Sequence, residues 1–279
     1  MTVCEALADA ATRLTALPGP ARLDAERLMA AALGVAPGAM MLAHLDDPAP
    51  AVFASFVDRR LAHEPIPYIT GRAGFWSIEL ELGPGVLIPR ADSETLIAAA
   101  VAHFGAQGPG TILDLGTGPG TLLLAALDQW PESEGLGVDI SETALDHARA
   151  NAARLGFAER AAFRSGDWSD GVVGRFDLVL CNPPYIETGA SLMASVVAWE
   201  PPEALFAGVD GLDAYRALAP QLGRLVAPGG IACIEIGAGQ ETAVSALFAD
   251  RGFTISSRLD LNGIVRCLIL RPDAFSLGL

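Results

Sequence analysis

The residues best suited to chemistry stand at the end of the apolar run FDLVLCNPPY, residues 176–185. Residues 176–181 are typical of a buried strand, and the two prolines that follow lack the N–H donors that a strand needs. We therefore expect the strand to end at Asn182. Because the prolines restrict the neighbouring backbone, they fix both the Asn182 side chain and the Pro183 carbonyl. The segment thus predicts two oxygen acceptors at the carboxyl end of a strand.

A fixed pair of acceptors suits a planar NH2 group, which has two hydrogens to donate. The nitrogen of such a group is a poor nucleophile because its lone pair is delocalised into a carbonyl or a ring. Hydrogen bonds from both hydrogens to Asn182 and Pro183 would free that lone pair and aim it at an electrophile, so that positioning and electrostatics supply the catalysis. Tyr185 offers a flat face on which a planar amide or base can stack. Taken alone, the segment also fits an ordinary strand that ends at Pro-Pro.

A second group of residues has the spacing of a nucleoside-binding site. Residues 111–115 form an apolar strand that leads into the glycine-rich turn at 116–120. Residues 135–140 are expected to form the next strand, where Asp139 lies about the right distance downstream to meet ribose hydroxyls. Asp114, two residues ahead of the glycines, would repel a pyrophosphate and suits a cationic cofactor that carries an amino acid. S-adenosylmethionine has both features, a ribose and a cationic amino-acid end.

Two further polar segments permit both a functional and a structural interpretation. Gly166, Asp167 and Trp168 follow a third short strand, where an acid can meet the adenine amino group and an indole its face. Trp168 is equally compatible with core packing. The segment at residues 90–94 opens a helix, and Asp92 or Ser93 can serve as its N-cap. We interpret that segment as a capped helix start.

The first part of the chain predicts helices only. Apolar residues recur at helical spacing in residues 3–17, 21–33 and 52–61, which predicts a small helical bundle. We place this helical substrate-recognition domain at residues 1–70. It carries 5 arginines against 8 acids over residues 1–64 and offers no cluster of metal ligands, since its two histidines stand alone.

The rest of the chain predicts an α/β domain. Partial alternation of apolar residues, followed by Gly-Pro-Gly at 83–85, indicates a β-hairpin linker over residues 71–90. Strands and helices then alternate and close on an antiparallel pair of strands. This pattern predicts a Rossmann-like sheet in a domain at residues 91–279.

Composition limits the kinds of partner and compartment. The 279 residues suffice for one large domain and a smaller one. A formal charge of −15, from 18 basic and 33 acidic residues, makes duplex DNA an unsuitable partner. Four separated cysteines without a CxxC pair argue against zinc and disulfides, and Cys181, Cys233 and Cys267 are expected to be core thiols. With no basic segment at the start and no long apolar run, we expect a cytoplasmic, metal-free monomer without a membrane partner.

Together these motifs resemble the protein-(glutamine-N5) methyltransferases that modify peptide chain release factors. The resemblance runs from about residue 60 to 271 in successive blocks. These blocks are PIPYITG at 65–71, FW at 75–76, GVLIPRADSE at 85–94, DLGTGPG at 114–120, GVDIS at 137–141, GDW at 166–168, NPPY at 182–185, EPPEAL at 200–205, DGLDAYR at 210–216 and EIGAGQ at 235–240. The NPPY block also occurs in DNA adenine-N6 methyltransferases, whereas the surrounding blocks are much more specific.

The resemblance implies a class I methyltransferase fold and methyl transfer from S-adenosylmethionine to the glutamine side-chain nitrogen in the Gly-Gly-Gln loop of release factors, which leaves S-adenosylhomocysteine. It implies that the cofactor contacts Gly116, Thr117, Gly118, Pro119, Gly120, Asp139, Trp168 and Asn182. The glutamine amide would be held by Asn182, Pro183, Pro184 and Tyr185, with Asn182, Pro183 and Tyr185 as the catalytic residues. The helical bundle would help to grip the release factor.

The chain departs from the family pattern at Ala91, Ser93, Ala207 and the GIVR block at 263–266. None of these positions lies in NPPY or in the glycine-rich turn. Two alternative functions stay open. A nucleic-acid adenine-N6 methyltransferase would use the same acceptors on a flipped base and would need a basic groove. A cofactor-binding docking module without turnover would not need an intact Asn-Pro-Pro-Tyr.

Overall fold

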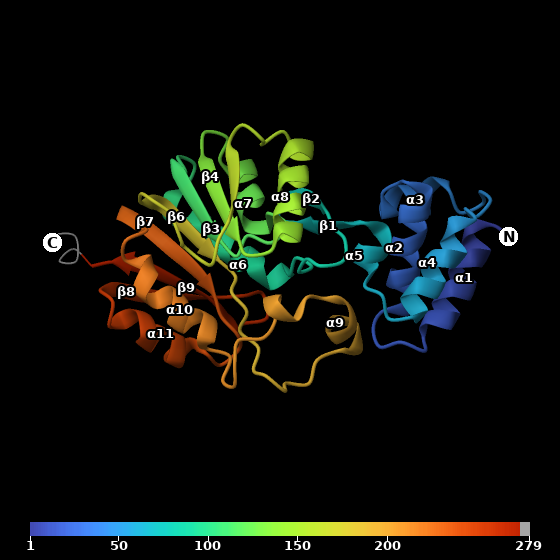
Figure 1. The fold of residues 1–279 in the computed structure, drawn as a ribbon. Helices are drawn as coiled ribbons and strands as arrows, with labels where there is room; N and C mark the ends of the chain where they lie inside the picture. The colour runs from blue at the N-terminus through green and yellow to red at the C-terminus, as the bar shows by residue number, and fades with distance from the viewer. Residues whose placement is uncertain (274–279) are drawn as a thin grey trace. The chain divides into compact units, whose positions relative to one another are not determined.

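The computed structural model describes residues 1–273, which form two compact units (Figure 1). The helical unit comprises Met1–Arg72, Leu82–Pro84 and Leu192–Trp199. The sheet unit comprises Ala73–Glu81, Gly85–Ser191 and the described residues from Glu200 onward. The helical unit therefore takes in two later segments, of which Leu192–Trp199 lies far along the chain from the main body.

The helical unit is built from short helices around an apolar core. They are α1 (Val3–Leu14), α2 (Ala21–Leu33), α3 (Pro37–Ala43), α4 (Val52–Leu61) and α5 (Ile66–Thr70). The unit also contains α9 (Ala194–Trp199), which has no buried residue. The sequence predicts α1, α2 and α4, while α3 and α5 are too short for periodicity to reveal. No single helix among residues 1–273 is long and apolar enough to cross a membrane, although α2 and α3 pass that test together as a pair bent by 84°.

A two-stranded hairpin, β1 (Arg72–Phe75) and β2 (Ile78–Glu81), lies within residues 71–90, but its turn is at Trp76 and Ser77 and not at the Gly-Pro-Gly of residues 83–85. Its turn is held to two helices of the sheet unit, α6 (Glu94–Phe104) and α7 (Thr121–Gln129). The backbone N–H of Trp76 donates to Glu94 Oε1 at 2.8 Å, and the Trp76 indole donates to Gln129 Oε1 at 3.1 Å. The hairpin is thereby fixed to two helices of the sheet unit.

The sheet unit contains a seven-stranded sheet in the order β5-β4-β3-β6-β7-β9-β8. Its strands are β3 (Thr111–Leu115), β4 (Glu134–Asp139), β5 (Ala161–Ser165), β6 (Phe176–Cys181), β7 (Val226–Glu235), β8 (Phe253–Leu259) and β9 (Val265–Pro272). The first five strands in this order are parallel, and β9 pairs antiparallel with both β7 and β8. The Rossmann-like sheet with a closing antiparallel pair is confirmed.

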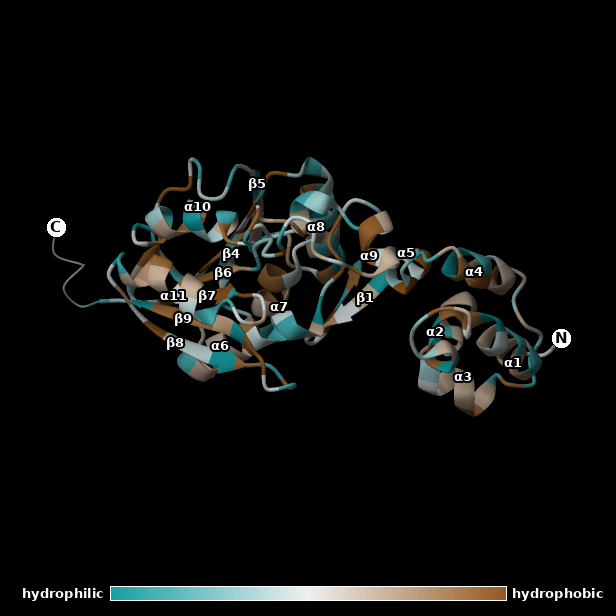
Figure 2. Ribbon diagram, turned by 90° about the horizontal axis from the view of Figure 1, so that it is seen from below, coloured by the Kyte–Doolittle hydropathy of each residue, from teal (hydrophilic) through white to brown (hydrophobic). Residues whose placement is uncertain are grey.

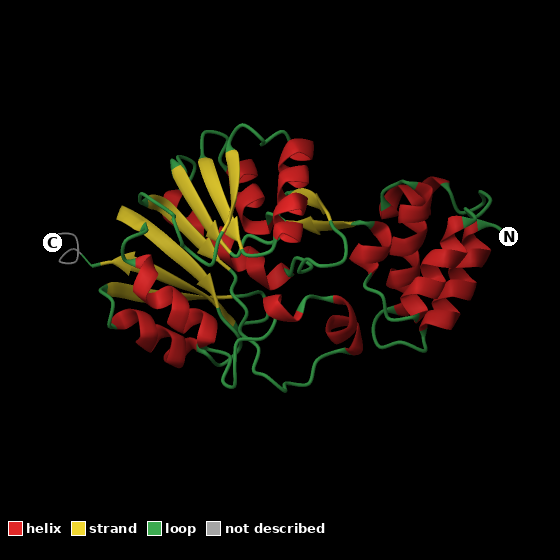
Figure 3. Cartoon of the chain, in the orientation of Figure 1, coloured by secondary structure: helices red, strands yellow, loops and turns green. Residues whose placement is uncertain are grey.

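Helices cover both faces of this sheet (Figure 3). The helices α6, α7 and α8 (Glu142–Leu155) pack on one face, and α10 (Asp213–Leu222) and α11 (Glu241–Ala249) on the other. The strands in the middle of the sheet and helix α7 are largely hydrophobic (Figure 2), as expected for elements buried on both sides. The three thiols expected in the core, Cys181, Cys233 and Cys267, are buried.

The strand order reverses between β3 and β6, which places the ligand crevice of such sheets at the carboxyl ends of these two strands. Their register pairs Leu115 of β3 with Cys181 of β6. The next residues along each strand, Gly116 and Asn182, therefore leave the sheet side by side. The fold thus brings the glycine-rich turn and the NPPY segment to one place.

Candidate active site

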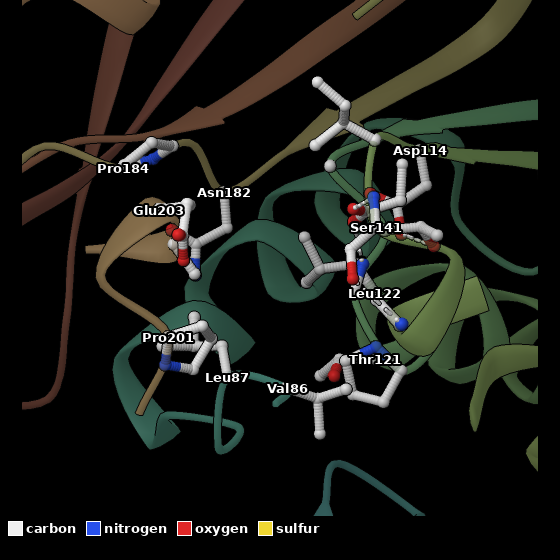
Figure 4. Close-up of a pocket in the computed structure, with 18 of the residues that line it drawn as sticks. Val86, Leu87, Asp114, Thr121, Leu122, Ser141, Asn182, Pro184, Pro201 and Glu203 are labelled. Carbon is white, nitrogen blue, oxygen red and sulfur yellow. Dashed lines mark hydrogen bonds between the residues drawn. The ribbon is translucent and has the colours of Figure 1, made fainter. Parts of the chain in front are cut away.

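A cavity of about 510 Å³ opens at this crevice, and every residue that lines it belongs to the sheet unit. Figure 4 shows the labelled residues on two opposite sides. Asn182, Pro184, Pro201, Glu203 and Leu87 lie on one side, and Asp114, Thr121, Leu122 and Ser141 lie on the other. The cavity thus has one wall built around the NPPY segment and one built around the glycine-rich turn.

Asp139 holds the glycine-rich turn in place. Its Oδ2 accepts a hydrogen bond from the backbone N–H of Gly118 at 2.8 Å, and Oδ1 accepts one from the N–H of Ser141 at 2.9 Å. Gly118 has a φ of 56°, which a side chain would strain. Because each carboxylate oxygen has a second lone pair, Asp139 keeps acceptor capacity toward the cavity that it lines.

Asp114 is a fully buried carboxylate in the lining of the cavity. Its Oδ2 accepts from the Thr117 hydroxyl at 2.6 Å and from the Leu123 N–H at 3.2 Å. Its Oδ1 is buried without a hydrogen-bond partner among the described residues. Burial raises the pKa of Asp114 to about 7, against the lowering effect of the Thr117 and Leu123 hydrogen bonds. An unpaired buried carboxylate oxygen suits a cationic ligand group.

Trp168 has both roles that the sequence leaves open, a place in the binding site and a place in the core packing. Its ring lines the cavity and also packs against the core of the sheet unit. A Cβ atom on Gly116 would lie 3.8 Å from this ring. Gly166 and Asp167 line the same part of the cavity. Trp168 has a φ of 51°, which is uncommon for a large side chain and is held here by packing.

The four residues of the NPPY segment occupy different environments. Asn182 and Pro184 line the cavity, and Asn182 Nδ2 donates to the Ser93 hydroxyl at 3.1 Å. Pro183 is buried. Tyr185 is half-buried outside the lining, where its hydroxyl donates to Glu235 Oε1 at 3.2 Å and burial raises its pKa. Gly120, at the far end of the glycine-rich turn, is also outside the lining, whereas Gly116, Thr117, Gly118 and Pro119 are part of it.

Ser93 stands at the N-cap position of α6, one of the two residues that the sequence predicts there, but its side chain does not cap the helix. The helix is entered through a 3-10 turn, Ala91–Ser93, and neither Arg90 ahead of that turn nor Ser93 makes a side-chain cap hydrogen bond. The Ser93 backbone is already helical, so its hydroxyl does not point at the free N–H groups of the first turn. It accepts from Asn182 instead. The segment at residues 90–94 thereby contributes to the site.

The sequence gives no role to several residues on the Asn182 side of the cavity. Leu87, Arg90, Pro201 and Glu203 all line it. Arg90 Nη2 lies 2.5 Å from Oε1 of the buried Glu200, whose Oε2 accepts from the Ile88 N–H at 3.2 Å. These contacts join residues about 110 positions apart. The only sequence signal for them is the pair of family blocks at 85–94 and 200–205.

Comparison with known proteins agrees with this architecture. The profile of a methyltransferase domain family matches residues 108–248, and that of the PrmC N-terminal domain matches residues 5–71. A release factor glutamine methyltransferase of Rhodospirillum rubrum is 43% identical over 261 residues, covering 91% of this chain and 79% of that protein. One from Cereibacter sphaeroides is 40% identical over 282 residues, covering 98% of this chain and 100% of that protein. The chain belongs to the release factor glutamine methyltransferase family.

As a member of this family the chain is an S-adenosylmethionine-dependent methyltransferase. Solved structures show the same fold at low identity. A methyltransferase from Pyrococcus furiosus matches with a TM-score of 0.55 and 16% identity, covering 79% of this chain and 99% of that one. A 16S rRNA N2 G1207 methyltransferase from T. thermophilus, in complex with AdoMet and guanosine, matches with a TM-score of 0.52 and 18% identity. The match covers 72% of this chain and 49% of that one. The class I methyltransferase fold is confirmed.

Replacing Asp139 with Ala is expected to raise the dissociation constant for S-adenosylmethionine by about 10- to 100-fold, the loss of roughly 1–3 kcal/mol of charge-assisted hydrogen bonding. The change removes acceptors for a ribose and also frees the Gly118 N–H that fixes the turn. Isothermal titration calorimetry measures the constant directly. Asp146→Ala, on the exposed surface of α8, is the matched control. An unchanged affinity for Asp139→Ala would show that neither role matters for binding.

Proposed function

We propose that this methyltransferase transfers the methyl group of S-adenosylmethionine to the side-chain nitrogen N5 of the glutamine in the Gly-Gly-Gln motif of peptide chain release factors. The observation that carries the proposal is the placement of Asn182. It follows the last residue of β6 at the strand-order reversal, lines the cavity and uses its NH2 group on Ser93. Its Oδ1 is thereby left as an acceptor for an NH2 group of the substrate.

The wall around Asn182 acts on the substrate by positioning. The glutamine NH2 donates one hydrogen to Asn182 Oδ1 and the other to the Pro183 carbonyl, and these bonds favour a geometry in which the nitrogen lone pair leaves conjugation with the amide carbonyl. Pro184 restricts the backbone at Pro183, so the two acceptors are fixed before the substrate arrives. Tyr185 anchors the segment through its hydroxyl. As N5 gains the methyl group, it gives up one of its two original hydrogens as a proton to water, and the sulfur–methyl bond breaks to leave S-adenosylhomocysteine.

The opposite wall holds the cofactor. S-adenosylmethionine supplies an electrophilic methyl group bonded to a positively charged sulfur. Asp114, with its unpaired buried oxygen, is the group that fits the cationic amino-acid end. Asp139 would accept from the ribose hydroxyls and Trp168 would offer its ring to the adenine, while the glycines of the turn at residues 116–120 would let the backbone approach the cofactor closely. These residues orient the cofactor toward the Asn182 wall, which Figure 4 shows across the cavity.

The partner is a protein in the cytoplasm, where release factors work. The net charge of −15 disfavours a nucleic-acid substrate. We assign the helical domain at residues 1–70 to gripping the body of the release factor. The domain at residues 91–279 then carries out the chemistry, with the hairpin at residues 71–90 as the link.

The experiment that tests the proposed function measures transfer of labelled methyl from S-adenosylmethionine to a purified, unmethylated release factor. A variant factor with Ala in place of the loop glutamine and an adenine-containing DNA are assayed in parallel. We expect label on the unaltered factor alone. Label on DNA alone would assign the enzyme to the adenine class. Label on no acceptor, with cofactor bound, would contradict the proposed substrate.

A further inference from the structure

The loop that carries Trp168 is anchored at both of its ends. We call residues 166–172, which follow β5, the Trp168 loop. Its first residue, Gly166, donates its N–H to the carbonyl of Asp139 at 3.0 Å. Trp168 has a φ of 51°, a conformation that a large side chain keeps only where the surrounding contacts enforce it. Besides the packing of the ring, the next residue, Ser169, makes such contacts.

Ser169 is fully buried, and part of its polar group is satisfied by the end of helix α10. Its backbone N–H donates to Gln221 Oε1 at 3.3 Å, and its hydroxyl donates to the same oxygen. Gln221 Nε2 donates to the carbonyl of Ala217, one turn earlier in the helix, at 2.8 Å. Because the NH2 group is bonded to its own helix, the Gln221 amide turns its oxygen toward Ser169.

Arg224 adds three hydrogen bonds to the same loop. Its Nη2 donates to the Ser169 hydroxyl oxygen at 2.6 Å and to the Ser169 carbonyl at 3.0 Å. Its Nη1 donates to the carbonyl of Val172 at 2.9 Å. The Val172 N–H also donates to the Ser169 carbonyl, at 3.0 Å, so the guanidinium spans a closed turn. A planar guanidinium holds its donors in a fixed geometry, which suits this set of three acceptors.

The first residues of the Trp168 loop border the cavity. Gly166, Asp167 and Trp168 belong to its lining, whereas neither Gln221 nor Arg224 does. The glutamine and the arginine lie 52 and 55 residues along the chain from the serine that they hold. They can therefore influence a bound cofactor only through the loop.

We propose that Arg224 and Gln221 are positioning residues for cofactor binding, which clamp Ser169 so that Trp168 keeps its ring in the cavity wall before the cofactor arrives. The inference rests on the proposed function for the adenine that this ring meets. A loop that is already fixed loses little conformational freedom on binding, which strengthens affinity. Without the clamp, only the fraction of molecules with the loop in place binds, and the apparent dissociation constant rises by the inverse of that fraction.

Exchange of Arg224 for Ala tests the proposal by separating affinity from turnover. We expect R224A to raise the dissociation constant for S-adenosylmethionine about tenfold, as for a loop in place about one tenth of the time. Its kcat at saturating cofactor should stay within about twofold of wild type, because every cofactor complex then has the loop in place. Q221L, which removes the acceptor of both Ser169 donors, should act in the same direction. Arg175→Ala is the matched control, since Arg175 also bonds to two backbone carbonyls, those of Gly223 and Val226.

A double variant tests whether the clamp acts through the ring of Trp168. W168A should raise the dissociation constant by about 10- to 100-fold through the lost stacking on a base. Adding R224A to W168A should raise it by less than about threefold more, because the clamp then has no ring to position. Fully multiplied losses in the double variant would overturn the proposal, since Arg224 would then act independently of Trp168.

Hydrogen exchange in the free protein reports the clamp without any methyl acceptor. We expect the amide hydrogens of residues 166–173 to exchange about tenfold faster in R224A than in wild type or R175A. Unchanged exchange in R224A would overturn the proposal. Faster exchange with an unchanged dissociation constant would also overturn it, because Arg224 would then brace the fold alone. Faster exchange and weaker cofactor binding in an enzyme that methylates no release factor would keep the positioning role and contradict only the proposed substrate.

Discussion

Replacing Asn182 with Ala is expected to lower kcat for methyl transfer by about 10²–10³-fold, the loss that follows removal of one fixed polar contact in a catalytic site. The Ala side chain offers no acceptor for the substrate NH2, and it also leaves the Ser93 hydroxyl without its donor. The opposite wall of the cavity keeps its contacts, because neither Asp114 nor Asp139 bonds to Asn182. Cofactor affinity should therefore fall much less than turnover. Single-turnover kinetics and calorimetry measure the two quantities separately.

The matched control for this variant is Asn262→Ala, in the turn between β8 and β9. That turn uses the backbone N–H of Asn262, which the substitution preserves. We expect wild-type turnover from the control. Wild-type turnover from Asn182→Ala as well would remove the basis for assigning the acceptor role to this residue.

Exchange of Asp114 for Asn is expected to raise the dissociation constant for S-adenosylmethionine by about 10- to 100-fold, because a charged partner contributes roughly 1.5–3 kcal/mol. Burial raises the pKa of Asp114 to about 7, so the free protein carries the proton on this group below neutral pH. A cationic ligand binds the ionised form and releases that proton. Wild-type affinity should therefore weaken as the pH falls below about 7, and the affinity of D114N should lose that dependence. Calorimetry across pH 5.5–8 tests both statements, with the exposed Asp170→Asn as control.

The same substitution, D114N, weakens cofactor binding but is expected to stabilise the cofactor-free protein at alkaline pH. The folded pKa lies above the ordinary value of 3.8, so the folded state binds the proton more tightly than the unfolded state. The contribution of Asp114 to the free energy of unfolding is therefore most favourable below pH 4 and is lost as the pH rises toward about 7. At pH 8, D114N without cofactor should melt at a higher temperature than wild type. A lower Tm at pH 8 would show that the ionised carboxylate stabilises the free protein.

The sequence predicts those site residues whose roles follow from their neighbours in the chain. Two consecutive prolines after an apolar strand must end that strand, and the structure ends β6 at Cys181. The spacing from the glycines to Asp139 follows from one strand-turn-helix unit, so that residue is identifiable without knowing the rest of the fold. Both segments meet because parallel strands deliver their carboxyl ends to one edge of the sheet.

The sequence is uninformative where a role depends on a partner far along the chain. Ser93 has a typical capping residue type and an acid-rich helix start, so local rules favour an N-cap. Its actual partner, Asn182, is 89 residues away. Glu235 similarly lies at the end of an apolar strand, where nothing nearby indicates that its carboxylate contacts Tyr185, 50 residues earlier. Such pairings are set by strand order and register, which local periodicity does not encode.

The measurement that tests the central claim most directly is fragmentation mass spectrometry of the methylated product. A release factor treated with the enzyme and S-adenosylmethionine is digested, and the modified peptide is fragmented to locate the added methyl group. We predict one methyl group on the side-chain nitrogen of the glutamine in the Gly-Gly-Gln motif, absent when the enzyme carries Asn182→Ala. A methyl group on any other residue, or unmodified glutamine after exhaustive reaction with active enzyme, would contradict the account.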